Sequence, residues 1–205
     1  MNGFRKEFTT FSVALIAVAI AINIGAGQIP RSVGLPLYLD SIGTVLVGVL
    51  VGPWAGALTG FLANTVWTVT GLFPQAIAWA GVAAIIGALA GAFGKAGWMK
   101  DWWRAGLAGL ITGVVAAILS APIAAYVFGG VTGNAGTDAI VAAWRAAGLD
   151  ALFSNVAQGT MSDPLDKLVT YLIVWAVLMA LPQRLKARFS GESVPAQKRS
   201  TPKKK

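Results

Sequence analysis

The side chains that could do chemistry in this sequence are carboxylates, amides, hydroxyls and aromatic rings. The 205 residues include no cysteine and no histidine, so thiolate catalysis, a histidine general base and the usual zinc and copper ligand sets are excluded. No nucleophile with a neighbouring base and no cluster of acids in the middle of an apolar stretch marks a catalytic site. The sequence therefore predicts no enzymatic activity, no metal site and no resident cofactor.

The polar side chains instead gather near one end of each apolar stretch. The opposite ends consist of valine, leucine, isoleucine, alanine and glycine, with Thr59 and Thr112 as the few polar members. A channel or a proton-coupled carrier would place ionisable groups near the middle of the membrane, and none is expected there. Aromatic walls with a few amides and carboxylates are typical of a pocket for a small solute. The predicted substrate-binding residues are Asn23, Asp40, Asn64, Trp67, Thr68, Gln75, Trp79, Asn155, Gln158, Asp166 and Tyr171.

Structural roles compete with ligand contact at the carboxylates. Asp40 precedes Ser-Ile-Gly-Thr and could cap a helix N-terminus as well as contact a ligand. Asp163 is a stronger cap candidate, because Pro164 follows it and proline prefers the first helical position. Asp166 and Lys167 would then lie in the first turn of the last helix, where they could be solvated or paired.

The aromatic and amide candidates also have ordinary structural interpretations. Trp67 and Trp79 could belong to the belt of aromatic residues at a membrane surface. An amide within an apolar stretch needs hydrogen-bond partners, which a neighbouring helix could supply to Asn23, Asn64 or Gln75 as well as a ligand could.

The elements that must position these residues are apolar helices. A content of 56% hydrophobic and 12% charged residues is typical of a chain that lives in lipid, where each helical crossing takes about 20 residues. We predict an all-α integral membrane protein with six transmembrane helices in residues 1–188 and a disordered basic cytoplasmic tail in residues 189–205. Residues 129–164 are expected to be a long connection with a short amphipathic stretch at 142–153. The predicted spans cover about 8–26, 40–51, 54–70, 75–94, 105–128 and 165–182.

The distribution of basic residues predicts the orientation of these spans. With six spans, 13 of the 16 lysines and arginines fall on the side that holds both termini, and only Arg31, Arg145 and Lys167 fall on the other. Basic segments are retained in the cytoplasm, so both termini are predicted to be cytoplasmic and the polar ends of the helices to face outside. The same placement explains the net charge of +8 without a nucleic-acid partner.

Small residues recur at four-residue spacing and predict close helix contacts. Pairs such as Gly48 with Gly52 and Gly87 with Gly91 are expected to let helices within the bundle approach each other. The stripe in the first span, Ala17, Ala21 and Gly25, could instead face a partner protein.

These features resemble the substrate-binding S components of energy-coupling-factor (ECF) transporters. The resemblance covers roughly residues 5–188 and rests on six short spans, on the Ala17-Val-Ala-Ile-Ala21 stretch and on the Leu37-Tyr-Leu-Asp-Ser-Ile-Gly-Thr-Val-Leu-Val-Gly segment. The segment leads into Gly52-Pro-Trp-Ala-Gly-Ala-Leu-Thr-Gly, and Ser162-Asp-Pro-Leu-Asp-Lys-Leu also looks like members of this family. The implied fold is an S-component-like bundle.

The resemblance implies a subunit that binds a vitamin-like micronutrient at the outer face of a bacterial or archaeal cell membrane. In this family a transmembrane coupling subunit grips the first helix through a small-residue motif, here Ala17, Ala21 and Gly25. Two ATPase subunits then drive toppling of the S component. The chain has no Gly-x-x-x-x-Gly-Lys-Ser/Thr loop, so partners would supply ATP hydrolysis.

Two other functions remain open from the sequence. A solitary membrane carrier would work without ATPase partners, and copurification of a coupling module distinguishes it from an S component. A membrane sensor domain would be expected to carry an output domain, in place of the predicted tail. An intramembrane enzyme is the weakest alternative, because the groups it needs are absent.

Overall fold

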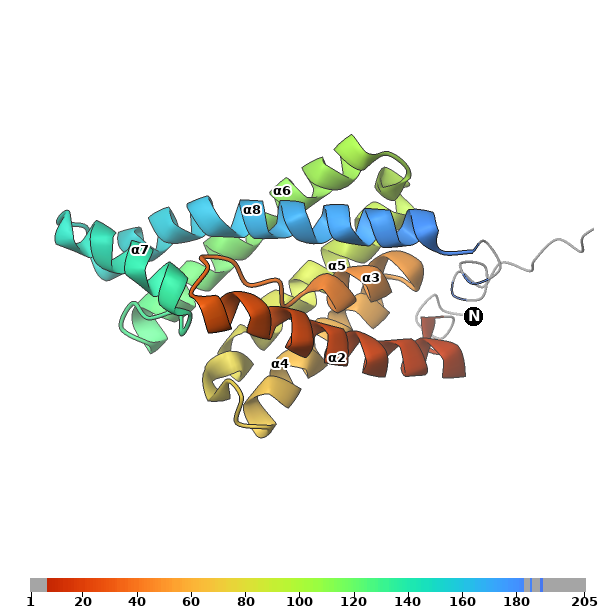
Figure 1. Cartoon of the computed structure of the whole chain (residues 1–205), viewed down its shortest axis with the longest axis horizontal. Coiled ribbons are helices and arrows are strands. Elements are labelled where there is room, and N and C mark those ends of the chain that lie inside the picture. Colours follow the sequence, from red (N-terminus) through yellow and green to blue (C-terminus); the bar gives the residue numbers. More distant parts are fainter. Residues whose placement is uncertain (1–6, 183–184, 186–188, 190–205) are drawn as a thin grey trace, which may run out of the picture.

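The computed structural model describes residues 7–182, 185 and 189, all of whose regular elements are helices (Figure 1). The predicted all-α class is therefore confirmed for this part of the chain. Arg5, Lys6 and the predicted tail after Phe189 lie outside the described residues. The elements are α2 (Thr10–Val33), α3 (Ile42–Leu50), α4 (Pro53–Val69), η1 (Pro74–Trp79), α5 (Ala80–Lys95), η2 (Trp98–Lys100), α6 (Trp102–Pro122), η3 (Ile123–Val127), α7 (Ala135–Ala146) and α8 (Ala151–Ala180).

Three helical segments are long and apolar enough to cross a membrane, which is the pattern of a membrane protein. They are Thr10–Val33, Pro74–Lys95 and Trp102–Val127. Among the other described helices, α3 and α4 are shorter, with 9 and 17 residues. Helix α8 has 30 residues, but its sequence contains Asp163, Asp166 and Lys167.

The start of α8 corrects the sequence-based expectation. The predicted span began at Leu165 with Asp163 as its cap, whereas the helix begins at Ala151 and Asp150 is the N-cap, accepting a 2.8 Å hydrogen bond from the Phe153 amide. The predicted amphipathic stretch at 142–153 falls across the end of α7 and the start of α8. Pro164 lies inside α8.

Residues 151–164 are helical and not the expected connection, and the polar residues of 151–167 occupy one face of α8. Spacings of three and four residues place Asn155, Gln158 and Ser162 on a buried face, while Phe153 and Leu165 are exposed. A helix that turns its polar face inward and its apolar face outward is suited to a lipid environment. The high polarity of this segment therefore did not indicate a loop.

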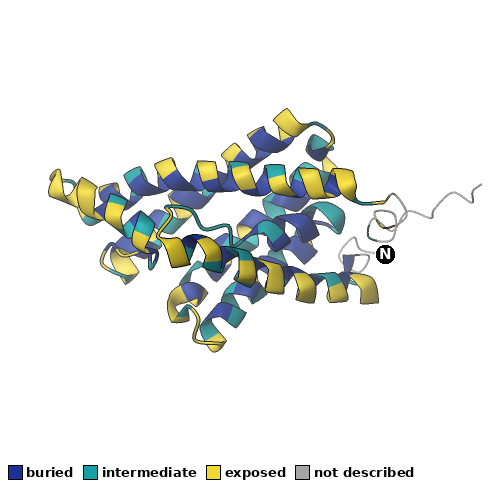
Figure 2. Ribbon diagram, in the orientation of Figure 1, coloured by how far each residue is buried: buried dark blue, intermediate teal, exposed yellow. Residues whose placement is uncertain are grey.

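Glycine stripes bring the helices of the bundle into backbone contact, as predicted. A Cβ atom on Gly87 of α5 would collide with the backbone of Gly56 in α4, and one on Gly91 would collide with the backbone of Pro53. On α6, a Cβ atom on Gly113 would collide with the backbone of Pro164 in α8. The stripe on α2 is different, because Ala17, Ala21 and Gly25 are exposed. Figure 2 shows exposed residues along the length of α2.

A buried carboxylate just before α2 was not anticipated from the sequence. The Oε2 atom of Glu7 accepts hydrogen bonds of 2.9 and 3.0 Å from the amides of Trp54 and Ala55 in the first turn of α4, where amides have no acceptor within the helix. Its Oε1 atom lies 3.0 Å from the Lys95 Nζ atom. Glu7 thus connects the start of α2, the N-terminus of α4 and the end of α5.

Candidate substrate-binding site

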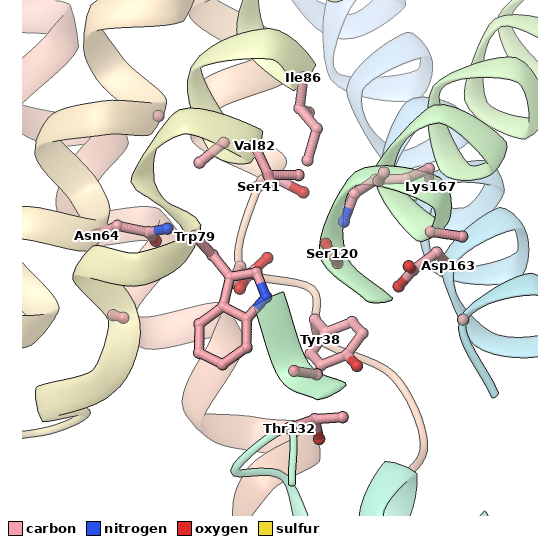
Figure 3. Close-up of a pocket in the computed structure, with 18 of the residues that line it drawn as sticks. Tyr38, Ser41, Asn64, Trp79, Val82, Ile86, Ser120, Thr132, Asp163 and Lys167 are labelled. Carbon is pink, nitrogen blue, oxygen red and sulfur yellow. The ribbon is translucent and has the colours of Figure 1, made fainter. Parts of the chain in front are cut away.

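A cavity of about 100 Å³ lies among α2, α3, α4, α5, α6 and α8 (Figure 3). The loop after α2 and the segment around Thr132 also contribute residues to its walls. Below it, Val82 and Ile86 belong both to the cavity wall and to the largest apolar core, together with Tyr171 and Val174 of α8. One side of the cavity is therefore bounded by the packed apolar core.

One wall of the cavity is aromatic. The rings of Phe73 and Trp79 are nearly parallel, with an interplanar angle of 17° and centroids 6.0 Å apart. Phe128 stacks on Trp79 at 4.9 Å, and Trp67 meets the Phe73 edge at 6.4 Å. The Arg31 guanidinium lies 3.7 Å from the centroid of Phe73 and donates a 2.9 Å hydrogen bond to the Gly133 carbonyl. Trp67, Phe73 and Trp79 line the cavity, so a ligand there contacts aromatic side chains.

The opposite wall is charged and belongs to α8. Asp166 and Lys167 form a buried ion pair, with the Nζ atom of Lys167 bound to Oδ2 of Asp166. The other oxygen of Asp166, Oδ1, accepts hydrogen bonds of 2.9 and 2.8 Å from the amides of Tyr38 and Leu39. Leu39 has a positive φ of 50°, a conformation that this anchoring helps to hold. Asp166 thus fixes the loop that brings Tyr38, Asp40 and Ser41 to the cavity.

The Tyr38 hydroxyl lies beside the amide of Gln158 and the hydroxyl of Thr137. Burial raises its pKa above the ordinary value of a tyrosine, so Tyr38 presents a protonated hydroxyl to the cavity.

Three buried polar atoms in the cavity wall make no hydrogen bond within the described part of the chain. They are Ser41 Oγ, Asn155 Oδ1 and Gln158 Nε2. The Nδ2 atom of Asn155 donates to the Ala151 carbonyl at 2.8 Å and to the Gly130 carbonyl at 3.3 Å, so its Oδ1 atom is the one left free. Buried polar groups are normally hydrogen-bonded, and each exception calls for a partner. A bound solute would supply one.

The structure places six of the predicted site residues in the cavity wall. They are Asp40, Asn64, Trp67, Trp79, Asn155 and Gln158. The expectation that Asp40 caps α3 is wrong, because Ser41 is the N-cap residue and no side chain caps this terminus. The carboxylate of Asp40 lines the cavity instead.

Five predicted site residues lie elsewhere. Asn23 donates to Thr44 Oγ1 and accepts from the Gly43 amide, thereby joining α2 to α3. Thr68 Oγ1 accepts from the Ile77 amide, Gln75 is exposed, and Tyr171 pairs with Thr112 through their hydroxyls at 2.9 Å. Asp166 does not line the cavity, but it forms an ion pair with Lys167, which does.

Several lining residues were outside the predicted set. The sequence favours a capping role for Asp163, and the signal for its place in the cavity is that it follows Gly159 by four residues and Asn155 by eight on one helix face. Arg31 and Phe73 lie near helix ends and carried no sequence signal for the cavity. The further lining residues include Tyr38, Ser41, Thr44, Ser120, Thr132 and Lys167.

Comparisons of the chain with protein-family models, with curated proteins and with solved structures found no match.

Proposed function

We propose that this protein is the substrate-binding S component of an ECF-type importer, which captures a vitamin-like micronutrient at the outer face of the membrane. The observation that carries the proposal is the cavity with an aromatic wall, a charged wall and three buried polar atoms that lack partners. Such a lining is suited to a small ligand that is partly flat and partly polar. The chain itself catalyses no reaction in this proposal, and ATP hydrolysis belongs to two partner subunits.

The proposed topology has six membrane crossings. Besides the three long apolar segments, α3 and α4 form a hairpin at Gly52-Pro53, and α8 crosses with its polar face turned toward the cavity. The described ends, near Glu7 and Pro182, are on the cytoplasmic side in this proposal. The cavity, which includes Arg31 near the end of α2, is then in the outer half.

Single cysteines in this naturally cysteine-free chain test the topology. Ala96 and Ala146 are both exposed, and they lie on opposite sides of the membrane in the proposed arrangement. We expect Ala146→Cys, but not Ala96→Cys, to react with an impermeant maleimide added to intact cells. After permeabilisation both variants should react to a similar extent, which controls for thiol accessibility. Labelling of Ala96→Cys in intact cells would contradict the model of six crossings.

The α2 stripe supports the proposed assembly with a coupling subunit. Ala17 and Ala21 are exposed side by side on α2, and a Cβ atom on Gly25 would have no neighbour within 4 Å. Small side chains give a partner helix close access to the α2 backbone.

Replacing both Ala17 and Ala21 with tryptophan should abolish assembly and uptake because the bulk keeps the partner helix away. The solute affinity of the isolated subunit should stay within about two-fold, since neither residue lines the cavity. The measurements are copurification of the coupling module, uptake in cells and calorimetric binding. Ile22→Trp, at an exposed position of α2 that is already bulky, is the matched control and should assemble. Loss of binding with intact assembly would reverse the assignment.

Reconstitution separates this function from that of a solitary carrier. Purified protein alone in liposomes should bind solute without moving it across the bilayer. Uptake into such liposomes without ATP and without partners would favour the carrier instead.

A further inference from the structure

We propose that the cavity selects a planar cation that carries several N–H donors, such as a protonated amino-heterocycle or an amidinium. This inference rests on the proposed function, because it names the chemical class of the solute for the same site. It follows from the charges in the wall, the free acceptors and the aromatic surface.

The charges around the cavity leave one carboxylate without a compensating cation. Asp166 and Lys167 neutralise each other in a buried pair. Arg31 is the other cation in the wall, and it lies in the field of Asp40. Asp163 is the third carboxylate, buried to 6% exposure, and it lies in the field of Lys167, Asp166 and Asp40, so three carboxylates share two cations. A buried carboxylate is costly unless it is paired, so a ligand with one positive charge would complete the balance.

The hydrogen-bonding groups of the wall point to the same class of ligand. The Oδ1 atom of Asn155 can only accept, and the two donations from its Nδ2 atom hold it in that orientation. Asp163 follows on the same face of α8, and Gly159 between them lines the cavity where α8 packs closely against Ala117 of α6. A ligand along this face therefore meets acceptors at Asn155 and Asp163 and must itself bring N–H donors.

The two donors in the wall that have no hydrogen-bond partner among the described residues are uncharged. Gln158 Nε2 and the hydroxyl of Ser41 are free to bind a ligand acceptor. The ammonium of Lys167 is engaged with Asp166. An anionic ligand would therefore compete with Asp166 for the ammonium of Lys167 and would face the carboxylates of Asp40 and Asp163.

The aromatic wall adds the requirement for a flat ligand. Phe73 and Trp79 present parallel rings, and both line the cavity with Trp67. The face of an aromatic ring attracts a cation as well as a flat ring. A cavity of about 100 Å³ has room for a ligand of about one ring.

Three probes of nearly identical shape test the inference, namely benzamidine, benzamide and benzoate. They carry a positive charge, no charge and a negative charge on the same ring. We expect calorimetry on the detergent-purified full chain to show benzamidine binding at least about ten-fold more tightly than benzamide, and benzoate weakest. A tighter benzamide or benzoate, or no binding of any probe, would overturn the proposal.

Variants of Asp163 assign the preference to the cavity. Asp163→Asn keeps the shape of the side chain and removes its charge, so the preference for benzamidine over benzamide should fall to about two-fold or less. Asp163→Glu should retain the preference, and Asp101→Asn, at an exposed pair with Arg104, should not change it. An unchanged preference in a folded Asp163→Asn variant would contradict the proposal.

The native solute gives an independent outcome. Mass spectrometry of the ligand that copurifies with the protein should find a compound that is cationic at neutral pH. An anionic compound together with a copurifying coupling module would overturn the charge inference and leave the proposed function intact. Failure of the proposed function would instead show as uptake without any partner.

Discussion

Replacing Asp166 with alanine should lower the free energy of unfolding by about 3 to 5 kcal/mol, because the substitution leaves the buried Lys167 ammonium without its partner. The amides of Tyr38 and Leu39 lose their acceptor in the same variant. The loop that carries Asp40 and Ser41 should loosen, and solute binding should weaken along with stability. The measurement is unfolding of the detergent-solubilised protein by heat and by denaturant.

Two further variants separate the parts of this effect. The double variant Asp166→Ala with Lys167→Met removes both charges and should recover part of the lost stability, while the two loop amides remain without their acceptor. Asp101→Ala removes an exposed ion pair with Arg104 and should cost about 1 kcal/mol or less. A loss below about 1 kcal/mol for Asp166→Ala would show that the pair does not hold this wall together.

Replacing Gly87 with valine should be the most damaging change in the apolar half of the bundle. A Cβ atom at this position collides with the carbonyl group of Gly56, which belongs to the backbone of α4 and cannot rotate away. The two helices must therefore separate along their contact, and packing in a dense interior is lost. We expect a loss of about 3 kcal/mol or more, seen as a lower melting temperature or as failure to accumulate folded protein.

Gly81 on the same helix is the matched control for Gly87. A Cβ atom at Gly81 has no neighbour within 4 Å, so Gly81→Ala should fold and gain up to about 1 kcal/mol from its better helix propensity. Gly87→Ala tests the contact with a single methyl group. If Gly87→Ala melts like the unsubstituted protein, α4 and α5 do not pack as closely as described.

The sequence predicted the positions of the helices well in segments that are apolar throughout. The hairpin of α3 and α4 turns at Gly52-Pro53, as predicted. The helical segment predicted for about 75–94 corresponds to η1 followed by α5. The first helix extends to Val33, beyond the predicted limit near residue 26, because Pro30 is accommodated within it. The largest difference from the prediction is at α8, because polar residues that face the interior of a bundle have the composition of a connection.

The site was only partly accessible to sequence reasoning, and the two aspartates show why. Asp40 and Asp163 both stand in contexts that favour N-caps, and local context cannot reveal that Ser41 and Asp150 take those positions. Conversely, Asn23 looked like a ligand-binding amide but joins two helices through Thr44 and Gly43. An amide or carboxylate in an apolar stretch must find partners, yet composition does not say whether a helix or a solute provides them.

What the sequence by itself determined is the all-helical class, the apolar segments long enough to cross a membrane, and the exclusion of histidine and cysteine chemistry. These follow from composition and periodicity, which act locally along the chain. Only the tertiary structure decided which polar groups are already satisfied and which are free. Asp166 is bound by Lys167 and two loop amides, whereas Asp163, one turn earlier, faces the cavity. That difference arises from long-range contacts between α8 and the loop after α2, which no local pattern encodes.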